Sequence, residues 1–134
     1  KRDFSRVIKP LEFFGVNIKS NNNSLPIEIV GTNFLRPIKY NEYIGSAQVK
    51  SCTILSALNT PGVTTINAKS SRNHTELMLK YLGYPIKIKK EKNFDKISIS
   101  GLHQYKAFSY NVPGDISSAA FFIVFNIKFN PSNL

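Results

Sequence analysis

Short segments in which apolar and polar residues alternate recur along the chain, and this spacing predicts β-strands. Isoleucines alternate with lysines in residues 85–89 and with lysine and serines in residues 96–100. We expect these two segments to pair as antiparallel strands around a polar loop at residues 91–95. Residues 35–40 and the β-branched run at residues 63–66 predict two further strands.

Helical patterns separate these strands. Residues 46–58 carry small and apolar side chains nearly all the way round, which indicates a helix buried on most sides. Asn73 and Glu76 have the spacing of a capping box and predict a helix that continues through Tyr81 and ends at Gly83. The chain therefore alternates strands and helices, as an α/β or α+β fold does.

A third helix start follows the turn residues Pro113 and Gly114. Asp115, Ser117 and Ser118 place a carboxylate and two hydroxyls at this start. The first backbone N–H groups of a helix have no intrahelical acceptor, so such a terminus favours anionic or hydroxyl-rich ligands.

The chain contains an internal repeat with an offset of about seventy residues. Residues 13–18 correspond to residues 81–86, and each segment is followed by an alternating segment that ends in glycine, at Gly31 and at Gly101. We expect each copy to run strand, helix, strand, helix, strand, strand. The polar loop at residues 20–24 corresponds to the loop at residues 91–95.

The length and composition of the chain limit the possible number of domains and the class of protein. The 134 residues are 42% hydrophobic and can form one domain or parts of two. The chain begins without Met or a signal peptide, so we expect an internal piece of a longer protein. It has no apolar run of the ~18 residues that a membrane span needs. Cys52 is the only cysteine, which excludes an intrachain disulfide and suits a reducing cytosol.

The net charge of +10 raises the possibility of nucleic-acid binding. Fourteen of the eighteen basic residues are lysines, however, and most of them are scattered singly. Asparagine and isoleucine are comparably frequent, so a general compositional bias explains the charge better than a binding surface does. We therefore favour an anionic small-molecule substrate, with a non-catalytic nucleic-acid-binding module as the alternative from another class.

Three segments resemble motifs of one enzyme family in order and spacing: IGSAQVKS at residues 44–51, SRNHTE at residues 71–76 and NVPGDISSAA at residues 111–120. The family is that of the 5-enolpyruvylshikimate-3-phosphate synthases, and the resemblance covers nearly the whole chain. It implies repeated βαβαββ units with mixed sheets and buried parallel helices. Residues 1–111 would hold the end of one unit and one complete unit, and residues 112–134 a hinge and the start of the second domain.

The resemblance also implies an activity. The family transfers the enolpyruvyl group of phosphoenolpyruvate to the 5-hydroxyl of shikimate 3-phosphate and releases phosphate, with no metal or organic cofactor. We expect a monomeric cytoplasmic enzyme with no nucleic-acid or membrane partner. Because the family's proton-transfer groups lie outside these residues, the 134-residue chain alone should be inactive. A related enzyme acting on UDP-N-acetylglucosamine is the enzymatic alternative.

The resemblance assigns Ser46, Ala47, Gln48 and Arg72 to shikimate 3-phosphate, and Arg2 together with Gln48 to phosphoenolpyruvate. Each residue also has a structural interpretation. Ser46 can be an ordinary helix cap and Gln48 a solvated helix residue, while Arg72 can form a surface salt bridge with Glu76.

Further basic and acidic residues lie near these positions. Lys50 is interpreted as solvated and Arg6 as structural. Asp3 stands where the family has proline, and an acidic neighbour weakens an anion site at Arg2. Asp115 would lie beside the interdomain cleft, where a helix-capping role is at least as well supported as a ligand role.

Overall fold

The computed structural model describes residues 2–105 and 107–129, and within these ranges it contains four helices and two sheets. The larger sheet has the strand order β3-β4-β6-β5, formed by β3 (Lys39–Glu42), β4 (Val63–Lys69), β6 (Phe94–Ser100) and β5 (Ile86–Lys90). β3 and β4 are parallel, and the other two pairings are antiparallel. The mixed sheet that the family resemblance implied is confirmed.

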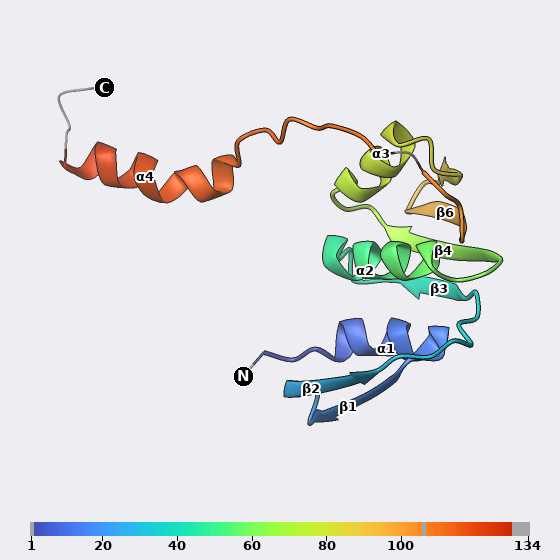
Figure 1. The fold of residues 1–134 in the computed structure, drawn as a ribbon. Coiled ribbons are helices and arrows are strands. Elements are labelled where there is room, and N and C mark those ends of the chain that lie inside the picture. The colour runs from blue at the N-terminus through green and yellow to red at the C-terminus, as the bar shows by residue number, and fades with distance from the viewer. Residues whose placement is uncertain (1, 106, 130–134) are drawn as a thin grey trace.

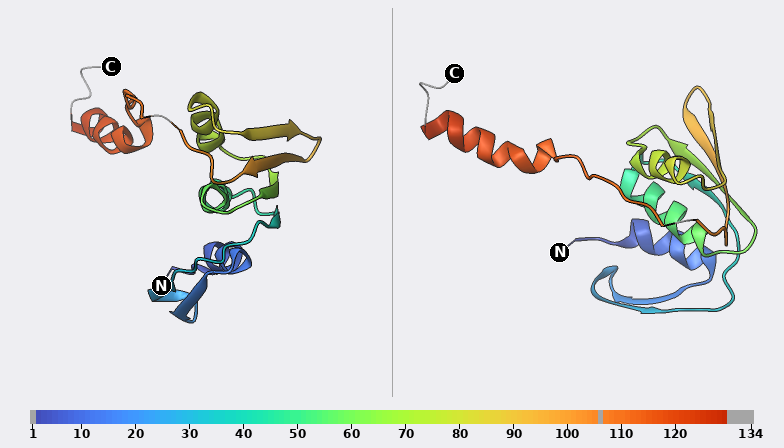
Figure 2. Two further views of the ribbon diagram at one scale, coloured as in Figure 1. Left: turned by 45° about the vertical axis from the view of Figure 1, so that its right-hand side comes forward. Right: turned by 45° about the horizontal axis from the view of Figure 1, so that its top comes forward.

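Residues 39–100 form one complete βαβαββ unit. Helix α2 (Ala47–Leu58) connects β3 to β4, and α3 (His74–Tyr81) connects β4 to β5. Both helices cover the same face of the four-stranded sheet (Figure 2). The pairing of residues 85–89 with residues 96–100 is confirmed with small shifts in the bounds, since Ile86 lies opposite Ile99 and Ile88 opposite Ile97.

The preceding segment is the end of a similar unit. Helix α1 (Ser5–Phe14) leads into a hairpin of β1 (Asn17–Asn21) and β2 (Ser24–Val30). Asn22 and Asn23 both have positive φ angles, of 49° and 55°, which is the conformation of a tight two-residue hairpin turn. α1 packs against α2, so that α2 lies between α1 and α3 (Figures 1 and 2).

The repeat seen in the sequence is visible at two helix ends. Gly83 follows α3 with a φ of 70°, and the amides of Gly83 and Tyr84 bond to the carbonyls of Lys80 and Leu79. Gly15 follows α1 with a φ of 102°, and the amides of Gly15 and Val16 form the same pair of bonds one repeat earlier. Both ends are Schellman motifs, which require the left-handed conformation that glycine adopts at low cost.

The core lies between α2, α3 and the four-stranded sheet. Its buried apolar residues are Phe14, Ile54, Ala57, Ile66, Ala68, Leu79, Tyr84, Ile86, Ile97 and Ile99. Within α2 only Gln48 and Leu55 are exposed, which confirms the burial of this helix on most sides. A rigid, buried α2 fixes the position of the residues at its N-terminus.

Two details of the predicted elements are wrong. The strand predicted at residues 35–40 begins only at Lys39. Pro37 has no N–H to donate to a sheet, which explains the late start. The capping box predicted at Asn73 and Glu76 is not formed, since Asn73 makes no side-chain cap bond and the Glu76 carboxylate turns into the protein.

Helix α4 (Ile116–Phe129) lies apart from the other elements, at the end of an extended segment (Figure 1). None of its residues is buried, and Phe121, Phe122, Val124 and Phe125 are 62–81% exposed. These side chains leave an apolar surface uncovered on α4. Within the described ranges no helix is both long and apolar enough to span a membrane.

Candidate functional site

The candidate site residues gather around the starts of three helices. α1, α2 and α3 all begin on the side of the molecule where the described chain begins (Figure 1). Arg2 precedes α1, Ser46 precedes α2 and Arg72 precedes α3. The positive ends of three helix dipoles therefore point toward the side that carries the predicted ligands of two anionic substrates.

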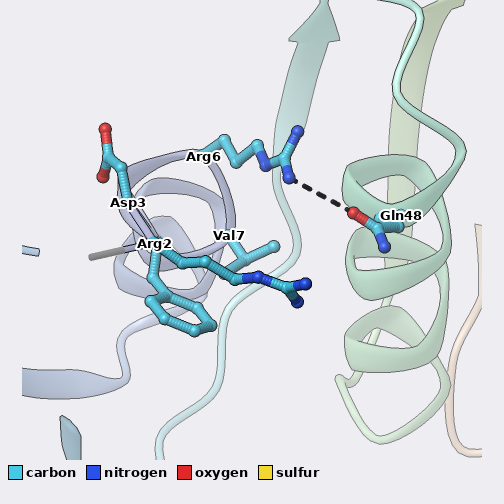
Figure 3. Close-up of a pocket in the computed structure, with 6 residues that line it drawn as sticks. Arg2, Asp3, Arg6, Val7 and Gln48 are labelled. Carbon is cyan, nitrogen blue, oxygen red and sulfur yellow. Dashed lines mark hydrogen bonds between the residues drawn. The ribbon is translucent and has the colours of Figure 1, made fainter. Parts of the chain in front are cut away.

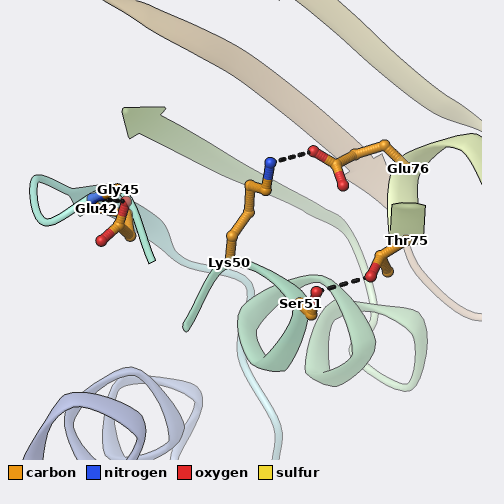
Figure 4. Close-up of polar contacts among 6 residues, drawn as sticks. All are labelled: Glu42, Gly45, Lys50, Ser51, Thr75 and Glu76. Carbon is orange, nitrogen blue, oxygen red and sulfur yellow. Dashed lines mark hydrogen bonds and ion pairs between the residues drawn. The ribbon is translucent and has the colours of Figure 1, made fainter. Parts of the chain in front are cut away.

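The start of α2 is organised by Glu42 at the end of β3. Its carboxylate is buried and accepts hydrogen bonds from the backbone N–H groups of Ile44, Gly45 and Ser46, at 2.9, 2.9 and 3.1 Å. Figure 4 shows the contact with Gly45. These three amides are therefore occupied by the protein itself and are not free for a ligand.

Ser46 is the N-cap of α2. Its Oγ accepts a hydrogen bond from the amide of Val49 at 3.3 Å, as the structural interpretation predicted. A hydroxyl that accepts through a lone pair still has its proton to donate. The amides of Ala47 and Gln48 occupy the first helical positions, which have no intrahelical acceptor. The start of α2 thus retains a hydroxyl donor and two backbone donors for an anion.

Arg2 and Gln48 line one pocket of about 680 Å³, together with Asp3, Phe4, Arg6 and Val7. The side chains of Arg2 and Arg6 both extend from the beginning of α1 toward Gln48 on α2 (Figure 3). Arg6 donates a hydrogen bond to Oε1 of Gln48 at 3.4 Å. The pocket therefore combines two guanidinium groups with an amide, a set of donors suited to phosphate or carboxylate oxygens.

Asp3 turns away from this pair of arginines (Figure 3). Its carboxylate accepts hydrogen bonds from the amide and the hydroxyl of Ser5, at 2.8 and 3.0 Å. The backbone bond from Ser5 is the main cause that holds the pKa of Asp3 below its ordinary value. The acidic residue expected to oppose an anion at Arg2 is thus engaged at the start of α1.

Arg72 is exposed, two residues before α3. The alternative salt bridge with Glu76 is not formed, because Glu76 is buried and pairs with Lys50 at 2.7 Å (Figure 4). The interpretation of Lys50 as solvated is therefore wrong: its side chain is 0% exposed. Arg72 does not line the pocket of Arg2 and Gln48, and its guanidinium has no ion pair among the described residues.

Asp115 caps α4. Its carboxylate accepts a hydrogen bond from the amide of Ser117 at 2.9 Å and from the hydroxyl of Ser118 at 2.7 Å. The bond from Ser118 is the main cause that lowers the pKa of Asp115. The helix-capping interpretation is the one that the structure supports.

The sequence profile described as EPSP synthase (3-phosphoshikimate 1-carboxyvinyltransferase) matches residues 1–128. The chain belongs to the EPSP synthase family. It is 47% identical to the 3-phosphoshikimate 1-carboxyvinyltransferase of Ruthia magnifica over an alignment of 125 residues. This alignment covers 92% of the present chain and 28% of that protein. The corresponding protein of Coxiella burnetii is 42% identical, over 92% of the present chain and 28% of that protein.

Solved structures agree with this assignment. An EPSP synthase from Acinetobacter baumannii superposes with a TM-score of 0.73 at 39% identity, over 92% of this chain and 27% of that chain. The present chain therefore spans a little more than a quarter of its EPSP synthase relatives, and it has their mixed α/β fold.

Sequence reasoning interpreted Arg6 as structural, and it overlooked Glu42 and the Lys50–Glu76 pair. Arg6 carried a signal, since it lies one turn from Arg2 on a helix start, but its contact with Gln48 depends on how α1 packs against α2. Glu42 also carried a weak signal, because a carboxylate just before the glycine of residues 44–46 can bind the amides of that turn. Within the described ranges no group of three or more His, Cys, Asp or Glu side chains is placed to hold a metal ion.

Proposed function

We propose that this chain is part of an enzyme that transfers the enolpyruvyl group of phosphoenolpyruvate to the 5-hydroxyl of shikimate 3-phosphate. The hydroxyl oxygen bonds to C2 of phosphoenolpyruvate while the hydroxyl proton is lost and C3 takes up a proton. Phosphate then leaves from C2 as C3 gives up a proton, which restores the double bond. Membership of the EPSP synthase family supports this reaction. The donors gathered at the helix starts support two anionic small molecules as its substrates.

The observation that carries the proposal is the shared pocket of Arg2 and Gln48. We assign Arg2 to phosphoenolpyruvate as a charge-assisted donor. We assign Gln48 to both substrates, since it lines that pocket and stands in the first turn of α2. We assign Ser46, Ala47 and Arg72 to the phosphate of shikimate 3-phosphate. Preorganised cationic donors in a site closed to water stabilise the charge that develops in the transition state.

The remaining cationic groups would come from the rest of the enzyme. In this proposal residues 1–111 belong to one domain, and residues 112–134 form the hinge and the start of the second domain. The extended segment before α4 and the exposed apolar side chains of that helix support a change of domain there. The 134-residue chain alone is then inactive, because it lacks one wall of the cleft. The full-length enzyme is proposed to be a cytoplasmic monomer.

The test is a phosphate-release assay on the full-length protein. We expect release to require phosphoenolpyruvate and shikimate 3-phosphate together. Release with UDP-N-acetylglucosamine in place of shikimate 3-phosphate would support the related transferase instead. No release with either acceptor from a folded full-length protein would contradict the proposal.

A further inference from the structure

A polar clamp, buried at Lys50 and Glu76 and partly buried at Ser51 and Thr75, joins the beginnings of α2 and α3. Lys50 Nζ lies 2.7 Å from Glu76 Oε1, and the hydroxyls of Ser51 and Thr75 share a hydrogen bond of 2.7 Å (Figure 4). Lys50 is the fourth residue of α2, and Glu76 is the third residue of α3. Adjacent residues on one helix thus contact adjacent residues on the other, which fixes how the two helix starts lie relative to one another.

In the buried ion pair, Lys50 and Glu76 neutralise only each other among the described residues. Both side chains are buried, with exposures of 0% and 3%. Neither the ammonium group nor Glu76 Oε2 has another hydrogen-bond partner among the described residues. Removal of one partner therefore leaves an uncompensated buried charge, whereas replacement of both by apolar residues of similar volume is often tolerated. Such a pair contributes little net stability, so its structural effect is to fix geometry.

The clamp lies between predicted ligands of the same substrate. Ser46 and Gln48 stand four and two residues before Lys50 on α2, and Arg72 stands four residues before Glu76 at the start of α3. Ser71, next to Arg72, has a buried hydroxyl. A change in the relative position of the two helix starts would move Arg72 with respect to Ser46.

We infer that the Lys50–Glu76 pair is a positioning element that sets the distance between the α2 and the α3 halves of the phosphate-binding site. This inference rests on the proposed function. The pair does not contact the substrate: it holds Arg72 where its guanidinium and the Ser46 hydroxyl reach the same phosphate group. Arg72, whose side chain is exposed, depends on this anchor because it has no ion pair of its own in the described ranges.

The test uses the full-length protein and the neutral double variant Lys50→Met/Glu76→Met, whose folding is checked by its melting temperature. We expect the Kd of shikimate 3-phosphate to rise about 5- to 20-fold, which corresponds to losing part of one charge-assisted contact. The KM of phosphoenolpyruvate should change less than twofold. The matched control is Lys19→Met/Glu28→Met, which removes a Lys–Glu pair that is 66% exposed on both sides. This control should bind like the wild type.

A thermodynamic cycle with Arg72→Ala separates positioning from general structure. If the pair acts through Arg72, the double Met substitution should have no further effect on shikimate 3-phosphate affinity in the Arg72→Ala background. Additive effects, or wild-type affinity of the folded double variant, would overturn the inference. Should the double variant not fold, Ser51→Ala breaks the second contact of the clamp, and the same non-additivity with Arg72→Ala is expected. Failure of the wild-type protein to bind shikimate 3-phosphate would refute the proposed function itself.

Discussion

The guanidinium group of Arg6 donates a hydrogen bond to the side-chain amide oxygen of Gln48, 42 residues further along the chain. This contact joins the first turn of α1 to the first turn of α2 and orients the amide of Gln48. With Oε1 held by Arg6, the Nε2 group is left to donate to a substrate oxygen. Both side chains line the pocket that also contains Arg2.

Arg6→Met should therefore weaken the binding of phosphoenolpyruvate more than the binding of shikimate 3-phosphate. Loss of the bond to Gln48 removes an orienting contact of ordinary strength, so the KM of phosphoenolpyruvate should rise about 2- to 10-fold. Steady-state kinetics of the full-length enzyme measure this effect. Lys9→Met, one turn further along α1 and exposed, is the matched control. Equal KM values in both variants would assign Arg6 a purely structural role.

Substitutions at the start of α2 should separate two roles. Gln48→Ala should raise the KM of both substrates by about 10-fold, because its amide donates to charged oxygens of each. Ser46→Ala should raise mainly the KM of shikimate 3-phosphate, and it also removes a helix cap worth ~1 kcal/mol. A Gln48→Ala enzyme with wild-type KM values and turnover would show that residues 46–48 only begin a helix.

Cys52 should react slowly with thiol reagents. Burial raises the pKa of this thiol above its ordinary value, so little of the reactive thiolate is present at neutral pH. Alkylation should be slower than for the same residue in urea and should accelerate as the pH rises. Mass spectrometry of the labelled peptide measures the rate at this position. Rapid labelling of the folded protein at pH 7 would contradict the partial burial of Cys52.

Gly101 should tolerate no side chain. A Cβ atom at this position would overlap the carbonyl oxygens of Thr60 and Ala57, where the end of β6 passes the end of α2. Gly101→Ala should lower the free energy of unfolding by ~1–3 kcal/mol, measured by urea denaturation. Gly31 is its counterpart in the repeat, and a Cβ atom added there would meet no other atom within 4 Å. Gly31→Ala should leave the unfolding midpoint nearly unchanged, and equal effects of the two would contradict this packing.

The start of α4 should depend on Asp115. Its lowered pKa keeps the carboxylate ionised, and the cap intact, until the pH falls below the ordinary value of 3.8. Asp115→Ala should speed amide hydrogen exchange at Ser117 and Ala119 at neutral pH, whereas Asp115→Asn should retain most of the protection, because an amide oxygen also caps a helix. Identical exchange in the Ala variant would exclude the capping role.

Local signals in the sequence were sufficient for most of the fold. Three predicted features each depend on a few neighbouring residues, and all three are present. They are the helix at residues 46–58, its cap at Ser46 and the end of α3 at Gly83. The repeat located the βαβαββ unit, and one pair of its glycines, Gly15 and Gly83, recurs where the backbone has a positive φ. The strand predicted at residues 35–40 starts only at Lys39, because Pro37 has no N–H to donate to the sheet.

Contacts between elements were not predictable in the same way. Lys50 looks solvated in sequence, since a lysine is almost never buried without a partner, and its partner Glu76 lies on another helix. Glu76 in turn matched a local capping pattern that the buried ion pair overrode. The pocket of Arg2 and Gln48 arises only when α1 packs against α2.

Calorimetric titration of shikimate 3-phosphate into the full-length protein, with phosphoenolpyruvate absent, tests the assignment of the phosphate site most directly. Arg72→Ala should weaken binding about 10- to 100-fold through loss of a charge-assisted bidentate contact, with little change in stability, since Arg72 is exposed. Lys80→Ala, which removes an exposed cation at the opposite end of α3, should bind like the wild type. A folded Arg72→Ala variant with wild-type affinity would contradict a phosphate site at the starts of α2 and α3.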